Sequence, residues 1–262
     1  MKISFLHTLA SNQALFAPYA DSLVATCLPV PVVVNHHVRE QLLVDARQAD
    51  SCPTKLDQVS TSVHITLKEI IQNDQPDMVL CTCSTIGGMA ESYGALSTSG
   101  GCRVLRVDRP MAEQALQYAN IVVLAALEST IQPTLDLLLQ TAESKAAASS
   151  GHSTPEKKDK DITTCVVPHA WDCFQRGDLP GYAHTIADFI LETYSNHNDD
   201  NESTTVIVLA QASMSPAKDL VEQRKKQPET SSPTVRVPRI LTSPDICIQY
   251  LADKILSRTQ QE

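Results

Sequence analysis

The sequence contains no apolar stretch of about 18 residues, the length that a membrane-spanning helix requires. The apolar run within residues 1–7 is also too short for a secretory signal. These two absences argue against a membrane-anchored or exported chain. We therefore expect a soluble, cytoplasmic protein with no membrane among its partners.

Basic residues are outnumbered by acidic ones, with 21 Lys and Arg against 30 Asp and Glu and a formal net charge of -9. Nucleic acids and anionic surfaces attract proteins that carry an excess of positive charge. The charge balance therefore argues against nucleic acid as a partner. A small molecule or another protein is the expected partner.

The sequence also has too few clustered ligands for a metal site. Cys81 and Cys83 form a Cys-x-Cys pair, but no second pair or nearby Cys/His cluster completes the four ligands of a zinc site. The Gly87-Gly88 pair lacks the lysine and the spacing of a phosphate-binding loop. The other cysteines are scattered, several in apolar segments, which is typical of buried reduced thiols rather than disulfides.

A chain of 262 residues suffices for one large α/β domain or for two small lobes. Short apolar runs alternate with helical patterns, which indicates βαβ units and a mainly parallel sheet. The expected strands are 3–7, 32–35, 78–81, 104–107, 121–125, 164–167 and 205–209. The expected helices are 13–24, 38–49, 60–73, 111–119, 131–144, 182–194 and 246–257. This order predicts a doubly wound α/β fold.

Three polar segments interrupt this alternation. Residues 143–161 combine an Ala/Ser/Gly run with a Lys- and Asp-rich run and have little to bury, so we expect a flexible surface insertion. Residues 196–203 are polar and acidic, and residues 224–232 are charged and flanked by proline. Both patterns predict solvated loops rather than recognition motifs.

Cys83 is the most informative residue of the chain. It follows an apolar strand at 78–81, and the sequence after it, Ser84-Thr85-Ile86, is that of a turn entering a helix. Backbone amides at a helix N-terminus stabilise anions, so this turn could bind a substrate carboxylate and lower the pKa of the thiol. A lone cysteine beside an apolar strand is more often a packing residue, and we interpret Cys81 in that way.

An internal repeat indicates two related lobes. Residues 78–85 and residues 206–213 share one pattern, an apolar strand followed by small, polar, small and hydroxyl-bearing residues. Ligands bind at strand ends in doubly wound sheets, so two such lobes would direct both turns to one cleft. In that arrangement Cys83 faces Gln211.

With these segments the chain resembles the Asp/Glu racemase superfamily, which includes glutamate, aspartate and hydantoin racemases, maleate isomerase and arylmalonate decarboxylase. The segments that carry the resemblance are Cys83-Ser84-Thr85, 106–113, 124–134, Ala170-Trp171, Gly177-Asp178 and 208–214. The resemblance implies an α/β fold of two pseudo-symmetric Rossmann-like lobes with the active site in the cleft between them. It also implies an enzyme without metal or organic cofactor that acts on a small carboxylate substrate. We expect residues 1–104 with 215–262 to form the first lobe and residues 105–214 the second.

Racemases of this kind use two cysteines as alternating base and acid on the two faces of the substrate. The resemblance places the first of these at Cys83, but the second position is Gln211, whose amide does not transfer protons. His7 is then the expected replacement base, because an imidazole titrates near pH 6.5. The expected substrate-binding residues are Thr8, Ser84, Thr85, Thr130 and Ser213.

The leading expectation is a racemase or isomerase that uses one cysteine for proton transfer beside a carboxylate or carbonyl group. A single thiol also suits a decarboxylase of malonate-type acids, although arylmalonate decarboxylase keeps its thiol on the second lobe. A noncatalytic ligand-binding protein of this fold is the third alternative. A homodimer or a higher homo-oligomer is compatible with all three.

Overall fold

The computed structural model describes residues 1–28, 30–49, 52–96, 101–149, 160–195, 204–226 and 236–259. The chain divides into two compact units, residues 1–110 with 244–262 and residues 111–243. Each unit is built around one four-stranded parallel sheet, which confirms the predicted α/β fold of two lobes. Among the described residues, no helix combines the length and the apolar character needed to cross a membrane.

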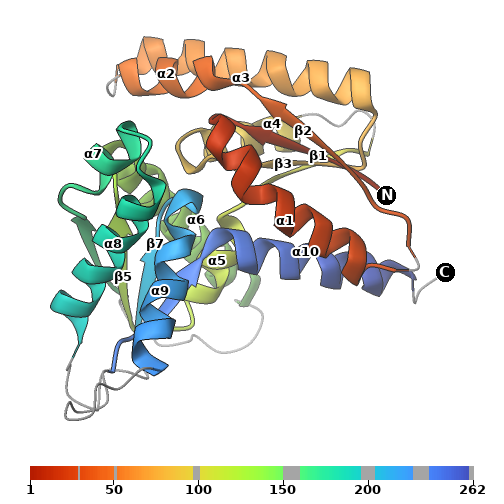
Figure 1. The fold of residues 1–262 in the computed structure, drawn as a ribbon. Helices are drawn as coiled ribbons and strands as arrows, with labels where there is room; N and C mark the ends of the chain where they lie inside the picture. The colour runs from red at the N-terminus through yellow and green to blue at the C-terminus, as the bar shows by residue number, and fades with distance from the viewer. Residues whose placement is uncertain are drawn as a thin grey trace. The chain divides into compact units, whose positions relative to one another are not determined.

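The first unit has a sheet of strand order β2-β1-β3-β4. Its strands are β1 (Lys2–His7), β2 (Val33–Val38), β3 (Met78–Cys81) and β4 (Arg103–Arg106). Its helices are α1 (Ala10–Thr26), α2 (Glu40–Gln48), α3 (Pro53–Asp74), α4 (Ser84–Leu96) and most of α10 (Ser243–Thr259). Figure 1 shows α2 and α3 on one side of this sheet, with α1 and α10 on the other.

The second unit repeats this plan with the strand order β6-β5-β7-β8. Its strands are β5 (Asn120–Ala125), β6 (Asp161–Val166), β7 (Thr205–Leu209) and β8 (Arg239–Thr242). Its helices are α6 (Ile131–Ser149), α7 (Ala170–Gln175), α8 (Leu179–Tyr194) and α9 (Ser215–Lys226), with the short turns η1 (Glu128–Thr130) and η2 (Ala212–Met214). Helix α5 (Arg109–Ala115) contains the boundary between the units.

The two strands of the internal repeat hold equivalent places in the two sheets. β3 pairs with β1 and β4, and β7 pairs with β5 and β8, all in parallel. The apolar strand residues alternate between the two faces of each sheet, so both faces are buried. In the first unit, Leu6, Val79 and Cys81 pack with α2, α3 and α4, whereas Phe5 packs with Phe16 of α1.

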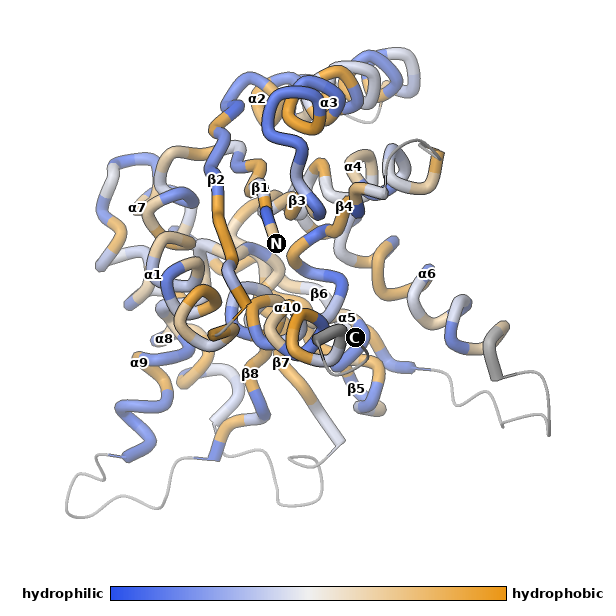
Figure 2. Tube along the Cα trace, turned by 90° about the vertical axis from the view of Figure 1, so that its right-hand side faces the viewer, coloured by the Kyte–Doolittle hydropathy of each residue, from blue (hydrophilic) through white to orange (hydrophobic). Residues whose placement is uncertain are grey.

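Strand β2 lies at the edge of the first sheet and changes character along its length. Figure 2 shows it passing from hydrophobic to hydrophilic colour, as expected for Val33 and Val34 followed by Asn35, His36 and His37. The sequence pattern placed this strand at 32–35, but it continues to Val38. The polar residues of β2 are retained in the strand because they pair with β1 and because their side chains find partners, such as Asp74 for His37.

Four of the predicted boundaries need correction. Residues 105–110 lie in the first unit rather than in the second, because β4 continues to Arg106 and pairs with β3. Residues 215–243 lie in the second unit rather than in the first, because β8 pairs with β7. Residues 143–149 of the expected insertion continue helix α6, and Asp161 already belongs to β6. The Ala-rich sequence favours this helical extension, since alanine has the highest helix propensity.

The remaining parts of the predicted loops have separate outcomes. Residues 224–226 form the last turn of α9, where basic side chains stabilise the negative end of the helix dipole. Residues 150–159, 196–203 and 227–235 lie outside the described residues. The sequence pattern did not predict helix α9 or strand β8, because both contain few apolar residues.

Candidate active site

The strands β1 and β3 end together at one edge of the first sheet. Leu6 pairs with Cys81, and the backbone N–H of Thr82 donates to the carbonyl oxygen of Leu6 at 3.0 Å. Extended two residues beyond the pair of Leu6 and Cys81, this register places Thr8 level with Cys83. The carboxyl ends of parallel strands are the ligand-binding edge of open α/β sheets. The predicted site residues of this unit therefore lie together.

Cys83 connects β3 to helix α4, which begins at Ser84. Its side chain is buried, with 7% of the residue exposed, and it belongs to an apolar cluster that includes Ile86 and Ala90 of the same helix. Ser84 is buried and Thr85 is half-buried in the first turn. The first amides of a helix have no intrahelical partner, so this turn presents donors to an anion beside the thiol.

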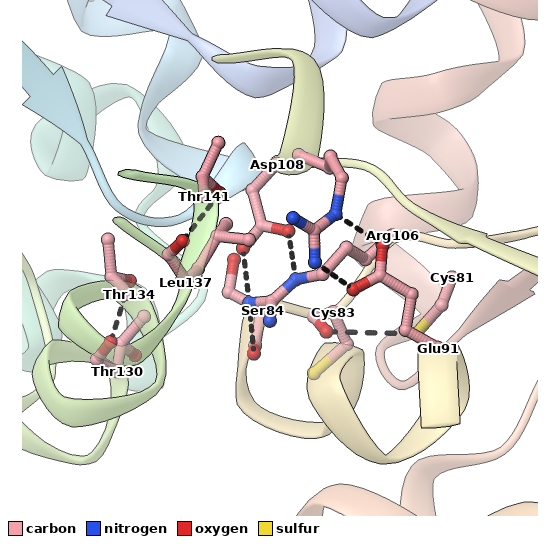
Figure 3. Close-up of polar contacts among 11 residues, drawn as sticks. Cys81, Cys83, Ser84, Glu91, Arg106, Asp108, Thr130, Thr134, Leu137 and Thr141 are labelled. Carbon is pink, nitrogen blue, oxygen red and sulfur yellow. Dashed lines mark hydrogen bonds and ion pairs between the residues drawn. The ribbon is translucent and has the colours of Figure 1, made fainter. Parts of the chain in front are cut away.

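Cys81 has a different environment. It is fully buried, and its Sγ donates to the carbonyl oxygen of Cys83 at 3.7 Å. Burial raises the pKa of the Cys81 thiol well above its usual range, and the nearby Cys83 raises it further. Figure 3 shows the sulfur atoms of the two cysteines pointing in different directions. Cys81 is therefore a protonated packing residue that also supports the backbone of the turn.

A buried ion pair lies behind this turn. The guanidinium of Arg106 donates from Nε to Asp108 Oδ1 at 2.7 Å and from Nη2 to Asp108 Oδ2 at 2.9 Å. Nη2 also approaches the carbonyl oxygen of Ser84 at 3.4 Å (Figure 3). Both charged residues are almost fully buried. The pair thus holds the first residue of α4 from the end of β4, and the sequence prediction did not include it.

The glycine pair of α4 makes room for this guanidinium. A Cβ atom on Gly87 would lie 2.8 Å from Arg106 Nε and 3.2 Å from Arg106 Cβ, whereas one on Gly88 would lie 3.6 Å from Nη1. Gly87 is therefore required by the close packing of Arg106, and Gly88 is not. The packing of Arg106, rather than phosphate binding, therefore accounts for a glycine at position 87.

This contrast predicts opposite effects for two neighbouring substitutions. Gly87→Ala is expected to destabilise the protein by about 1–3 kcal/mol, because the added methyl group overpacks a rigid ion pair. Gly88→Ala is expected to stabilise it by about 0.5–1 kcal/mol, because alanine favours an exposed helix position that has space. Urea denaturation of both variants measures the two changes, and a loss of stability in Gly88→Ala would contradict this account.

His7 lies at the predicted edge but both of its ring nitrogens are occupied. The hydroxyl of Thr82 donates to the carbonyl oxygen of Leu6, so His7 Nδ1 must donate to Thr82 Oγ1, at 2.9 Å. His7 Nε2 then accepts from His36 Nδ1 at 2.9 Å. Burial, with His36 and His37 nearby, lowers the pKa of His7 to about 3. The expected second base therefore has a neutral, fully buried imidazole without a free lone pair.

Gln211 occupies the position in the second unit that Cys83 occupies in the first. It precedes η2 after β7, and its Oε1 accepts from the backbone N–H of Ala126 at 2.6 Å. This bond links the ends of β7 and β5 and fixes the orientation of the carboxamide, since a backbone N–H requires an oxygen acceptor. The Gln211 side chain therefore connects the ends of β7 and β5, at the position where the resemblance expects a thiol.

The other predicted residues of the second unit lie at the same edge of its sheet. The hydroxyls of Ser213 and Tyr182 are 3.1 Å apart, and burial raises the pKa of Tyr182 above its usual range. Thr130 ends the turn η1 that follows β5, is buried, and accepts at its carbonyl oxygen from the Thr134 hydroxyl at 2.8 Å. In the part of the chain that the structure describes, no three His, Cys, Asp or Glu side chains gather as metal ligands.

No protein-family model and no curated protein matches the sequence. Among solved structures, the chain is similar to an Asp/Glu racemase homologue from Yersinia pestis, with 13% identity, coverage of 98% of this chain and 100% of the other, and a TM-score of 0.58. It is similar to glutamate racemase from Francisella tularensis in complex with D-glutamate, with 9% identity, coverage of 98% and 82%, and a TM-score of 0.58. It is also similar to allantoin racemase from Klebsiella pneumoniae, with 9% identity, coverage of 99% and 89%, and a TM-score of 0.54. The chain thus shares the fold of these solved racemase structures.

Proposed function

We propose that this protein is a cofactor-independent isomerase of the racemase type, which moves a proton at a carbon beside a carboxylate or carbonyl group. The observation that carries the proposal is the position of Cys83, at the common edge of β1 and β3 and directly before the first turn of α4. The solved structures similar to this chain include racemases, and one of these is in complex with D-glutamate. The proposed substrate is a small amino-acid-like or dicarboxylate molecule.

In the proposed reaction the Cys83 thiolate removes the proton from the substrate carbon. The electron pair passes into the adjacent carboxylate or carbonyl group, which becomes an enolate. The backbone amides of the first turn of α4, with the hydroxyls of Ser84 and Thr85, bind the substrate oxygens and stabilise the charge that develops on them. The Cys83 thiol then returns a proton to the carbon and regenerates the thiolate.

The proposed reaction differs from two-cysteine racemisation because Gln211 stands at the position of the second cysteine. Its carboxamide has no titrating proton, and its oxygen accepts from Ala126, so its proposed role is to donate a hydrogen bond to the substrate. Ser213 and Thr130 are further proposed substrate contacts, carried over from the resemblance. With Cys83 as the single thiol, the proton mostly returns to the face that it left, and inversion requires a water molecule to donate a proton on the opposite face. Isotope exchange is therefore expected to outpace inversion.

Deuterium wash-in tests this proposal. Amino acids, hydantoins and substituted malonates are incubated with the protein in D₂O, and α-deuteration, optical rotation and CO₂ release are followed. Gln211→Cys is expected to raise inversion relative to exchange by roughly 10²–10⁴-fold, the effect of one positioned acid or base. Gln211→Ser is the matched control, because it has the size of cysteine without an acidic thiol. Absence of α-deuteration across the panel would contradict the proposed function.

A decarboxylase of malonate-type acids is the second candidate, and the glutamine at position 211 favours it. Decarboxylation forms the enolate without a base and needs only one acid to protonate it. CO₂ release from substituted malonates, with one deuteron incorporated for each CO₂ lost, would identify this activity. Under the leading proposal, amino acids or hydantoins exchange and malonates release no CO₂.

A further inference from the structure

Two histidines from neighbouring strands stack on each other next to the turn that carries Cys83. His7 ends β1, and His36 lies in β2, the edge strand of the same sheet. Their ring centroids are 5.2 Å apart at an interplanar angle of 12°, and the Phe5 ring packs edge-on against both. His7 is fully buried, whereas His36 is half-buried. The packing therefore holds both imidazoles in place.

The hydrogen bonds of these rings run in one direction. Because the carbonyl oxygen of Leu6 can only accept, the Thr82 hydroxyl donates to it at 3.2 Å, and His7 Nδ1 donates to that hydroxyl at 2.9 Å. A neutral imidazole that donates from Nδ1 accepts at Nε2, so His36 Nδ1 donates to His7 Nε2 at 2.9 Å. The four groups therefore form one directed chain that begins at His36 and ends on β1.

His36 determines the direction of the Thr82 hydroxyl from the other end of this chain. If His7 carried its proton on Nε2, its Nδ1 would accept from the Thr82 hydroxyl, which would then turn away from Leu6. The donor from His36 excludes that tautomer. Thr82 is thus held to the Leu6 carbonyl oxygen by two bonds, from its backbone N–H at 3.0 Å and from its hydroxyl.

We propose that His36 is a positioning residue that acts through His7 to hold the turn of Cys83 on β1. Thr82 directly precedes Cys83, so the bonds that fix Thr82 also fix the thiol and the first turn of α4. His36 transfers no proton and does not touch the reacting atoms. The inference rests on the proposed function for the reaction of Cys83, whereas the hydrogen-bond chain can be tested without it.

Nitrogen-15 NMR of the imidazole rings tests the chain in the absence of substrate. Burial lowers the pKa of both His7 and His36, so both rings are neutral above the pH range in which histidine titrates. Each is expected to carry its proton on Nδ1. In His36→Leu, where nothing donates to Nε2 of His7, that ring is expected to populate the Nε2–H form. The proposal is overturned if His7 is protonated on Nε2 in wild type or keeps its tautomer in His36→Leu.

The rate of α-deuteration shows whether the chain matters for catalysis. His36→Leu is expected to lower this rate about 10–10²-fold, the cost of displacing a reacting group by about 1 Å. His36→Asn is expected to retain most of the rate, because its side-chain nitrogen is attached to Cγ, as Nδ1 is, and can still donate to His7. An equal loss in both variants would show that the donor is not what His36 contributes.

Alkylation of the Cys83 thiol reports on the turn even without a substrate. Cys83 is only 7% exposed, so iodoacetamide reaches it when the turn opens locally. His36→Leu is expected to accelerate this alkylation roughly 2–10-fold, the effect of losing one buried hydrogen bond, and His36→Asn is expected to stay near wild type. Tandem mass spectrometry locates the label. Cys81, which is fully buried in the preceding strand, is expected to remain unlabelled unless the whole unit unfolds.

His37→Leu is the matched control, because His37 is the next residue of the same strand but donates from Nε2 to Asp74 Oδ2 at 2.6 Å. It is expected to lower the unfolding midpoint and to leave the His7 tautomer and the alkylation of Cys83 as in wild type. Equal acceleration in His36→Leu and His37→Leu would reveal simple destabilisation and overturn the proposal. If the tautomers and the alkylation behave as expected but wild type deuterates no substrate, the proposed function fails and the positioning of the turn stands.

Discussion

Replacing Cys83 by alanine is expected to lower the rate of α-deuteration by at least roughly 10²–10⁴-fold, the contribution of a single positioned acid or base. The expectation rests on two features of the site. Cys83 lies between β3 and the start of α4, where backbone amides can stabilise the developing charge, and the histidine at the same edge has both ring nitrogens occupied. No second group of the first unit is therefore expected to take over the proton transfer.

The controls separate chemistry from folding. Cys27→Ala removes another fully buried thiol, at the C-terminal end of α1, and is expected to retain the exchange rate. Cys83→Ser keeps the size of the side chain and is expected to lose activity to a similar degree, because an alcohol is a far weaker acid than a thiol. Exchange by Cys83→Ala at the wild-type rate would exclude Cys83 as the proton carrier.

The fold could be predicted because its signal is local. The central strands β1, β3, β5 and β7 are apolar runs that are buried along almost their whole length. The repeat of residues 78–85 in residues 206–213 corresponds to equivalent strands with equivalent neighbours. Strand β8, with the sequence Arg-Ile-Leu-Thr, is too short to be distinguished from a loop. The boundary of the second unit depends on the pairing of β8 with β7, and the local sequence does not reveal such a long-range contact.

The candidate site could be predicted only in part, for a similar reason. The turn at Cys83 has a sequence signal, since an apolar strand gives way to small and hydroxyl-bearing residues. The role of His7 depends on its hydrogen bonds to Thr82, which follows β3, and to His36 of β2. The Arg106–Asp108 pair has little sequence signal, because Arg106 ends β4 and Asp108 lies in the turn that follows it.

Breaking the Arg106–Asp108 pair is expected to destabilise the first unit strongly. Asp108→Asn leaves the guanidinium of Arg106 buried without its counter-charge, which typically costs about 3–5 kcal/mol. That cost is a large share of a total stability of about 5–15 kcal/mol. Because Arg106 also contacts the carbonyl oxygen of Ser84, the turn at Cys83 is expected to shift, and α-deuteration should fall even where the variant is still folded.

A double-mutant cycle distinguishes the charge pair from simple packing. Arg106→Met and Asp108→Asn are each expected to destabilise strongly, whereas the double variant should lose much less than the sum, because neither charge remains buried alone. Glu91→Gln is the matched control, since Glu91 pairs with Arg109 in a more exposed position and should cost about 1 kcal/mol or less. Urea denaturation measures all four variants. Additive losses in the double variant would show that the two side chains stabilise the turn separately, through packing alone.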